Sequence, residues 1–240
     1  MKEVPPYASA HPDIRAIDFN HVLVLIDYRT GRVRCLLPAK AAQWRDVMTT
    51  GHTASLPTAG ARYLLTMGLL TPTPFPRPMK APVVVLAPSS SWGSTEHAAG
   101  VARPSRGPWL AAAAAMTLVF AVKRAGRTGT TMRRLTKTLD WASSLGRLPA
   151  SAEQVRSASD AVRRVGWLSP GRTACLEESA AVVLLLSARR LGVTWCHGVA
   201  PDPVRLHAWV ETWDGEAVGE PYSTRAYTPV LTIGDPRHRL

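Results

Sequence analysis

The sequence is short of cysteine and of long apolar runs, and each shortage excludes a class of protein. Its three cysteines, Cys35, Cys175 and Cys196, are too few and too scattered for a disulfide framework or a zinc knuckle. The longest apolar stretch, 109–122, is shorter than the roughly 20 residues of a membrane-spanning helix. Residues 1–12 lack the apolar core of a signal peptide. We therefore expect a cytoplasmic protein with no membrane span.

Phosphate-binding loops and metal-ligand spacings are also missing. No glycine-rich phosphate loop occurs, so nothing in the sequence indicates an ATP site. Cys196 and His197 precede His207, but they lack the paired spacing of zinc ligands, and neighbours on a strand point to opposite faces. The sequence therefore predicts neither a metal nor a cofactor.

Acidic side chains are fewer than basic ones, with 17 Asp and Glu against 29 Lys and Arg. The excess lies mainly in residues 109–172, where eleven basic and three acidic residues give +8, whereas residues 173–240 carry −2. A basic helical surface attracts an acidic peptide, a partner protein or nucleic acid, and it also occurs as an ordinary solvated face. Charge alone does not choose between these.

Residues 1–80 show a strand pair followed by two short helices. Thr30-Gly31 suits a hairpin turn between the strands, while Pro38 suits the start of a helix and Gly51 its end. The expected elements are strands at 22–26 and 33–37 and helices at 38–50 and 58–67. This order predicts a small winged-helix-like module.

The rest of the chain divides into a linker and a second domain. Eight prolines between residues 71 and 108 and a triple serine predict a Pro/Ser-rich linker over 81–108, with room for one strand at 83–86. The pattern then becomes helical, which predicts a second domain over 109–240. Helices are expected at 109–123, 131–145 and 152–165, ending near Gly126, Gly146 and Gly166.

Cys175 lies at the start of a strongly apolar helical segment, 174–191. Ser, Pro and Gly at 169–171 precede it, so Cys175 falls in or just before the first helical turn. The unpaired backbone N–H groups and the helix dipole favour a thiolate there, and the same N–H groups would stabilise an oxyanion at an attacked carbonyl. The alternative is that Cys175 is simply a small buried residue.

His207 supplies a base for such a thiolate. Residues 206–213 alternate as a strand, and Asp214-Gly215 favours a two-residue hairpin turn. In that register Trp209 pairs with Glu220, which places Glu220 diagonally beside His207, about 7 Å away.

Other side chains fit less well beside His207. Asp214 is roughly 23 Å along an extended strand, and Glu211 is roughly 13 Å along it. Glu220 is therefore the predicted partner of His207, and His197 is a backup base.

These residues carry a resemblance to a known family. The motifs are the stretch around the cysteine (171–179, GRTACLEES), Gly198-Val199, the histidine strand (207–211, HAWVE), 218–221 (VGEP) and 227–231 (YTPVL). Over residues 165–233 the chain resembles the transglutaminase-like cysteine protease of lasso peptide biosynthesis, the B protein. The amino-terminal module is similar to the leader-recognition element of ribosomal peptide biosynthesis, on its hairpin, Pro38, Trp44 and 68–70 (GLL).

The resemblance implies an α+β fold. A winged-helix-like recognition module would precede a transglutaminase/papain-like domain with helices packed on an antiparallel sheet. It also implies an enzyme that binds the leader of a precursor peptide, hydrolyses the leader–core bond and hands the core to a cyclase resembling asparagine synthetase. Cys175 would be the nucleophile, His207 the acid and base, and Glu220 the orienting carboxylate. The family typically has aspartate at this third position.

The resemblance also places leader binding at the edge of the small sheet, where a peptide would add as a strand. The residues implied are Arg32, Val33, Arg34, Cys35, Leu36, Leu37, Arg62 and Leu65. In the alternative interpretation, Val33, Cys35 and Leu37 only fill the core of the module.

Two other functions remain open. One is a nucleic-acid or peptide binding protein with a structural Cys–His pair, although the helix at 58–67 has only one basic residue, Arg62, where a groove-reading helix usually has several. Nucleic acid is therefore the less favoured partner. The other is a transamidating enzyme, because an amine can resolve a thioester as water does.

Overall fold

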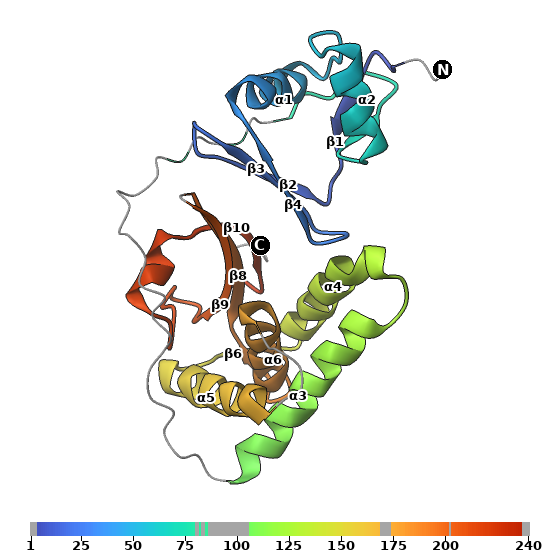
Figure 1. Cartoon of the computed structure of the whole chain (residues 1–240). Coiled ribbons are helices and arrows are strands. Elements are labelled where there is room, and N and C mark those ends of the chain that lie inside the picture. The colour runs from blue at the N-terminus through green and yellow to red at the C-terminus, as the bar shows by residue number, and fades with distance from the viewer. Residues whose placement is uncertain are drawn as a thin grey trace. The chain divides into compact units, whose positions relative to one another are not determined.

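The computed structural model describes residues 4–79, 82, 85, 106–168, 174–201 and 203–236 (Figure 1). It divides the chain into two compact units, Met1–Leu86 and Ala87–Leu240. The strand expected at 83–86 and most of the linker expected at 81–108 lie outside the described residues.

The first unit combines a three-stranded antiparallel sheet, in the order β2-β3-β4, with a two-stranded antiparallel pair, β1-β5, and two helices. Its elements are β1 (Ala8–Ala10), β2 (Ile14–Asp18), β3 (Leu23–Asp27), β4 (Arg32–Leu36), α1 (Pro38–Thr50), α2 (Thr58–Thr66) and β5 (Leu70–Pro72). The predicted hairpin is β3-β4, and both predicted helices are present. The short strands β1, β2 and β5 were not predicted. The assignment of this unit as winged-helix-like stays a prediction.

One apolar cluster holds the first unit together. Helix α1 starts at Pro38, whose missing N–H costs nothing in a first turn, and ends at Gly51, whose φ of 73° suits a left-handed cap. Its buried side chains include Trp44, which lies in the same cluster as Leu23 and Leu36 of the sheet. Strand β4 is an outer strand of its sheet.

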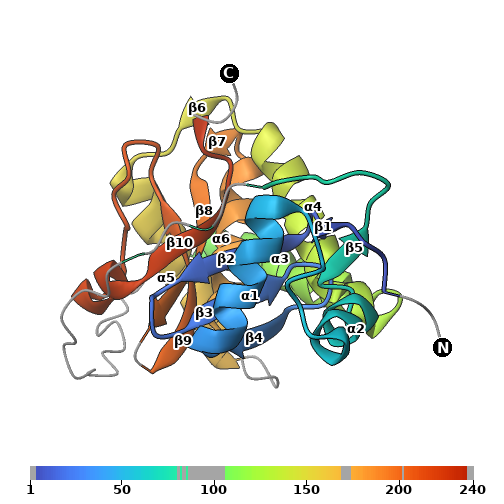
Figure 2. The same ribbon diagram turned by 90° about the horizontal axis from the view of Figure 1, so that it is seen from above.

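The second unit packs helices against a three-stranded antiparallel sheet in the order β10-β8-β9 (Figures 1 and 2). Its helices are α3 (Arg106–Arg124), α4 (Thr131–Ser144), α5 (Ala152–Leu168) and α6 (Cys175–Ser187), with short 3₁₀ turns η1 (Thr128–Thr130) and η2 (Tyr222–Ala226). Its strands are β6 (Leu148–Pro149), β7 (Leu191–Gly192), β8 (Thr194–Pro201), β9 (Val204–Glu211) and β10 (Thr228–Ile233).

Helix α6 is the centre of this unit. It contacts α3, α4 and α5 as well as β8 and β9, and every residue from Ser179 to Ser187 is buried. This explains why its sequence is apolar on all sides rather than along one stripe.

Three of the predicted helix boundaries are wrong. Helix α3 starts at Arg106 instead of residue 109, because Pro108 is tolerated in a first turn. Helix α5 runs through Gly166 to Leu168, since this glycine is buried inside the helix and does not cap it. Helix α6 ends at Ser187, four residues before the end of the predicted segment at Leu191.

Gly192 likewise serves packing and does not end a helix. A Cβ at Gly192 would lie 2.2 Å from the indole of Trp213. The strand β7 that contains it pairs in parallel with β6.

Among the described residues, no single helix has the length and apolar character to span a membrane. The pair 109–124 and 128–144 meets those criteria only when taken together, across a bend of 116°.

Candidate active site

Cys175 is the first residue of α6, as predicted. The preceding residue, Ala174, has extended backbone angles and no side-chain acceptor for a cap. The carboxylate of Glu177 instead accepts a hydrogen bond from the Ala174 backbone N–H at 3.1 Å and pairs with Lys123 of α3. A side chain from the third helical position therefore secures the helix start that carries Cys175.

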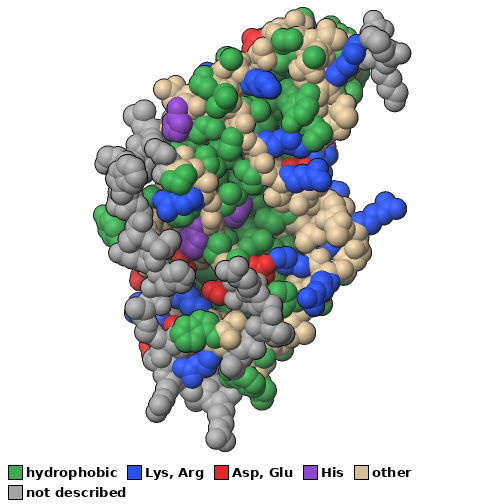
Figure 3. Space-filling view, viewed as in Figure 1, with side chains coloured by type: hydrophobic (Ala, Val, Ile, Leu, Met, Phe, Trp, Pro, Cys, Tyr) green, Lys and Arg blue, Asp and Glu red, His purple; other side chains and the backbone are tan. Residues whose placement is uncertain are grey.

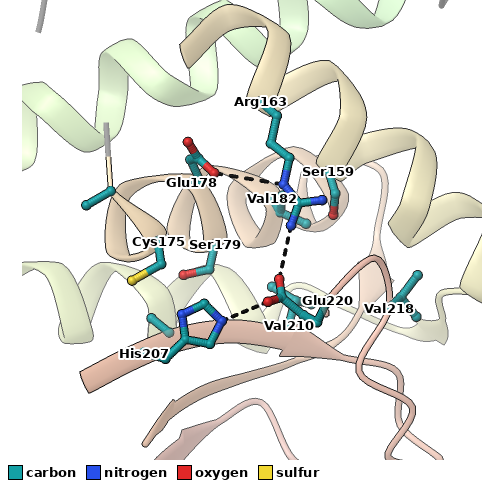
Figure 4. A pocket seen from close by; sticks show the side chains of 12 residues that line it. Ser159, Arg163, Cys175, Glu178, Ser179, Val182, His207, Val210, Val218 and Glu220 are labelled. Carbon is teal, nitrogen blue, oxygen red and sulfur yellow. Dashed lines mark hydrogen bonds and ion pairs between the residues drawn. The ribbon is translucent and has the colours of Figure 1, made fainter. Parts of the chain in front are cut away.

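His207 lies between Cys175 and Glu220 (Figure 4). Its Nε2 is 2.7 Å from Glu220 Oε2, and the sulfur of Cys175 is on the side of the other ring nitrogen. The side chain of His207 is 20% exposed and that of Glu220 is 10% exposed. Cys175 of α6, His207 of β9 and Glu220 of the following loop are thus brought together, with His207 in the middle.

The surroundings of His207 favour its charged form. Burial lowers its pKa, but the hydrogen bonds to Cys175 and Glu220, and the charges of both partners, raise the pKa to about 9. At neutral pH the ring is therefore an imidazolium, and Nε2 donates to the Glu220 carboxylate. An adjacent imidazolium favours the thiolate form of a cysteine.

His197, the predicted backup base, has the opposite character. Burial, together with the charge of His207, lowers the pKa of His197 to about 4. It lies on β8, stacked on Trp195, and it does not line the cavity beside Cys175.

Glu220 is held from a second side by Arg163 of α5. Arg163 Nη2 lies 3.1 Å from Glu220 Oε1, and Nη1 donates to the carbonyl oxygen of Gly219 at 2.9 Å. The hydroxyl of Thr224 donates to Glu220 Oε2 at 3.3 Å. Sequence reasoning missed Arg163, because a contact between α5 and a loop far along the chain leaves no local pattern.

The predicted hairpin register is wrong, although it led to Glu220. Strand β9 ends at Glu211, which bridges Ala217, so the turn spans Thr212 to Glu216 instead of two residues. The Thr212 hydroxyl accepts a hydrogen bond from the Glu216 backbone N–H, which stabilises the wider turn. Trp209 and Glu220 are therefore not strand partners. Asp214 is exposed within this turn and does not line the cavity.

Comparison with known protein families finds a match to the part of the chain that holds these residues. Residues 114–232 match the transglutaminase-like superfamily. These residues form a transglutaminase-like domain. The match includes Cys175, His207 and Glu220. No curated protein and no solved structure shows a significant match to the chain.

Aromatic rings pack around His207 in the transglutaminase-like domain. Trp209 is stacked on His207 with ring centroids 5.7 Å apart, and Tyr227 lies 5.2 Å away at a tilt. Gly198, directly opposite His207 on β8, makes room for this stack, because a Cβ there would lie 2.7 Å from the Trp209 ring. The spacing of His207 and Trp209 on one strand face was the available sequence signal.

A cavity of about 340 Å³ opens beside Cys175 in the same domain. Small apolar side chains from α6, β9 and the loop share its wall with the charged groups described above. The residues that line it are Ser159, Arg163, Ala174, Cys175, Glu178, Ser179, Val182, His207, Ala208, Val210, Val218 and Glu220. This volume accommodates one or two amino-acid side chains next to the sulfur.

The residues expected to bind a leader lie in the first unit, on β4 and α2. Leu36 is 7% exposed and belongs to the core, whereas Leu37 is 70% exposed. Cys35 is exposed and Val33 is half-buried, so the alternative in which Val33, Cys35 and Leu37 fill the core is wrong. Arg34 donates to the Tyr63 hydroxyl of α2 at 2.6 Å. The remaining residues are Arg32 and Arg62, both exposed, and Leu65, half-buried.

Proposed function

We propose that the transglutaminase-like domain is a cysteine peptidase. The observation that carries the proposal is the placement of His207 between the Cys175 sulfur and the Glu220 carboxylate, 2.7 Å from the carboxylate, with the pKa of His207 raised to about 9. A Cys–His pair that only supported the fold would not need a buried carboxylate on the far side of the ring. The arrangement is the one that nucleophilic acyl transfer requires.

The proposed reaction begins with attack of the Cys175 thiolate on the carbonyl carbon of the scissile bond. The oxyanion that forms is stabilised by the backbone N–H of Cys175 at the start of α6. His207 then donates its proton to the nitrogen of the leaving amine, the C–N bond breaks, and a thioester remains. His207, now neutral, accepts a proton from water as the water attacks the thioester. Collapse of this second intermediate releases the acid and restores the thiolate and imidazolium.

Glu220 acts on the reaction through His207. Its carboxylate accepts from Nε2, which keeps the other ring nitrogen directed to Cys175 and stabilises the imidazolium. Glutamate is one methylene longer than the aspartate typical of the family. Glu220 reaches His207 from a loop and not from a paired strand, and the longer side chain is compatible with that position.

The proposed substrate is the precursor of a lasso peptide, cut between leader and core. The motifs around Cys175 and His207 support this substrate through the family resemblance. The outer strand β4 supports it physically: its outer edge is not paired within the β2-β3-β4 sheet, and exposed side chains flank that edge. The released core would pass to an asparagine-synthetase-like cyclase.

The decisive assay incubates the full chain with a synthetic precursor peptide and follows the products by mass spectrometry. Cleavage at one bond, with a free carboxylate on the leader, is the expected result. An amide of an added amine in place of the acid would instead identify a transamidating enzyme. No reaction, together with a salt-dependent affinity for random DNA, would favour the nucleic-acid alternative. On the face shown in Figure 3, Lys and Arg side chains are scattered among uncharged and acidic ones.

A further inference from the structure

Arg163 is joined to two carboxylates and one carbonyl of the active site. Its Nη2 is 3.1 Å from Glu220 Oε1, its Nη1 is 2.9 Å from the Gly219 oxygen, and its Nε is 3.9 Å from Glu178 Oε2. The side chain is 22% exposed and lines the cavity beside Cys175 (Figure 4). One guanidinium therefore links α5, the first turns of α6 and the loop after β9.

The loop that carries Glu220 has little regular structure to fix it. Among the described residues, its backbone is bridged to β9 at Ala217, and residues 218–221 belong to no strand. Gly219, next to Glu220, has a φ of 71°, a conformation that glycine adopts freely. Side-chain contacts therefore help to determine where the carboxylate sits. His207 and Thr224 bond its Oε2, and Arg163 bonds both its Oε1 and the adjacent Gly219 carbonyl oxygen.

We infer that Arg163 is a positioning residue, which holds Glu220 against His207 by hydrogen-bonding both the Glu220 carboxylate and the adjacent Gly219 carbonyl oxygen. The inference rests on the proposed roles of Cys175, His207 and Glu220. Arg163 touches no reacting atom and acts only through Glu220.

The geometry requires arginine in particular. A guanidinium offers several N–H donors in one rigid plane, so it can bond Gly219 and Glu220 at once. A lysine ammonium in the same place is a point charge and reaches one of the two acceptors well. If Arg163 supplied only its charge, Arg163→Lys would leave the His207 pKa unchanged. If Arg163 positions Glu220, Arg163→Lys should change that pKa.

Charge and positioning also predict opposite changes at His207. If Arg163 contributed only charge, its loss would leave Glu220 in place with a less neutralised carboxylate, and the pKa of His207 would rise further. If Arg163 holds Glu220 in place, its loss frees the loop, His207 loses its partner, and its pKa falls. The other titratable groups that act on His207, Cys175 on α6 and His197 on β8, are the same in both cases.

The test measures His207 directly and needs no substrate. NMR titration of the His207 ring, assigned through its loss in His207→Ala, gives its pKa in each full-length variant. We expect Arg163→Gln and Arg163→Lys to lower this pKa by about one unit or more. Arg156→Gln, an exposed arginine on the same helix, should leave it unchanged.

A double variant excludes a general loss of structure. If Arg163 acts through Glu220, the double variant Arg163→Gln/Glu220→Gln should have the same His207 pKa as Glu220→Gln alone. Once the Glu220 carboxylate is gone, removing Arg163 has no further interaction with His207 to disturb. Three results would overturn the inference. The His207 pKa could rise in Arg163→Gln, it could stay at its original value in Arg163→Lys, or the pKa changes of Arg163→Gln and Glu220→Gln could add in the double variant. A chain that cleaves no precursor yet shows the expected pKa pattern would contradict the peptidase proposal and leave this inference standing.

Discussion

His207 and Glu220 meet at 2.7 Å although no strand pairing joins the segments that carry them. The contact therefore depends on side chains, chiefly the Arg163 and Thr224 bonds to the same carboxylate. The proposed catalytic base is consequently more sensitive to a few distant residues than a histidine fixed within a sheet would be.

Replacing the nucleophile should separate chemistry from binding. Cys175→Ala is expected to abolish leader cleavage in a mass-spectrometric assay, because no other side chain near His207 can form the thioester. Leader binding, measured by calorimetry, should be unchanged, since the expected binding residues belong to the first unit. Residual cleavage by Cys175→Ala would reject the proposed nucleophile.

Replacing the third residue should lower turnover strongly. Glu220→Gln keeps the size of the side chain but removes its charge, so the imidazolium loses its stabilising partner. We expect kcat to fall on the order of 10²- to 10⁴-fold, with KM little changed. Asp214→Asn is the matched control, because Asp214 is exposed in the turn. A dead Asp214→Asn with a normal Glu220→Gln would reverse the assignment.

The stability of the second unit should fall as the pH rises. The pKa of His207 is about 9 in the folded chain against an ordinary 6.5, so folding binds its proton more tightly. This contribution is fully present below pH 6.5 and is lost as the pH rises through about 9, up to about 3 kcal/mol of unfolding free energy. Denaturant unfolding at pH 6 and pH 9.5 measures the loss. The same pair of measurements on His207→Gln should show a smaller difference, and an equal one would exclude His207 as the source.

Adding one methyl group behind the aromatic stack should damage the site. In Gly198→Ala the new Cβ would lie 2.7 Å from the Trp209 ring and 2.8 Å from the Thr228 carbonyl oxygen, so the ring or the strand must shift. We expect a loss of about 1–3 kcal/mol of unfolding free energy and slower cleavage. Gly129→Ala serves as the control, because nothing lies within 4 Å of a Cβ there. Equal unfolding midpoints for the two variants would show that the close contact relaxes without cost.

The sequence predicted the parts of the site that depend on local pattern. The helix start at Cys175 and the strand with His207 follow from apolar periodicity and flanking turn residues. Glu220 was identified through a register that does not form, because the threonine at 212 bonds to Glu216 and widens the turn. The two-residue turn is a statistical preference, and this side-chain bond overrides it.

The rest of the site depends on contacts between segments far apart in sequence. Arg163 reaches a carboxylate 57 positions later, and Gly198 is needed because a tryptophan from the next strand lies over it. On α5, Arg163 directly follows the buried Ala161 and Val162, and sequence alone does not distinguish it from the basic residues on the exposed part of the helix.

The bond from Glu177 to Ala174, and the pairing of Glu177 with Lys123, make the reactivity of Cys175 depend on a helix that ends some fifty residues earlier. A fragment beginning at residue 131 would retain Cys175, His207 and Glu220 yet leave Glu177 without its cation. A shortened version of this chain should therefore include α3, because a boundary chosen from Cys175, His207 and Glu220 alone would remove the cation that pairs with Glu177.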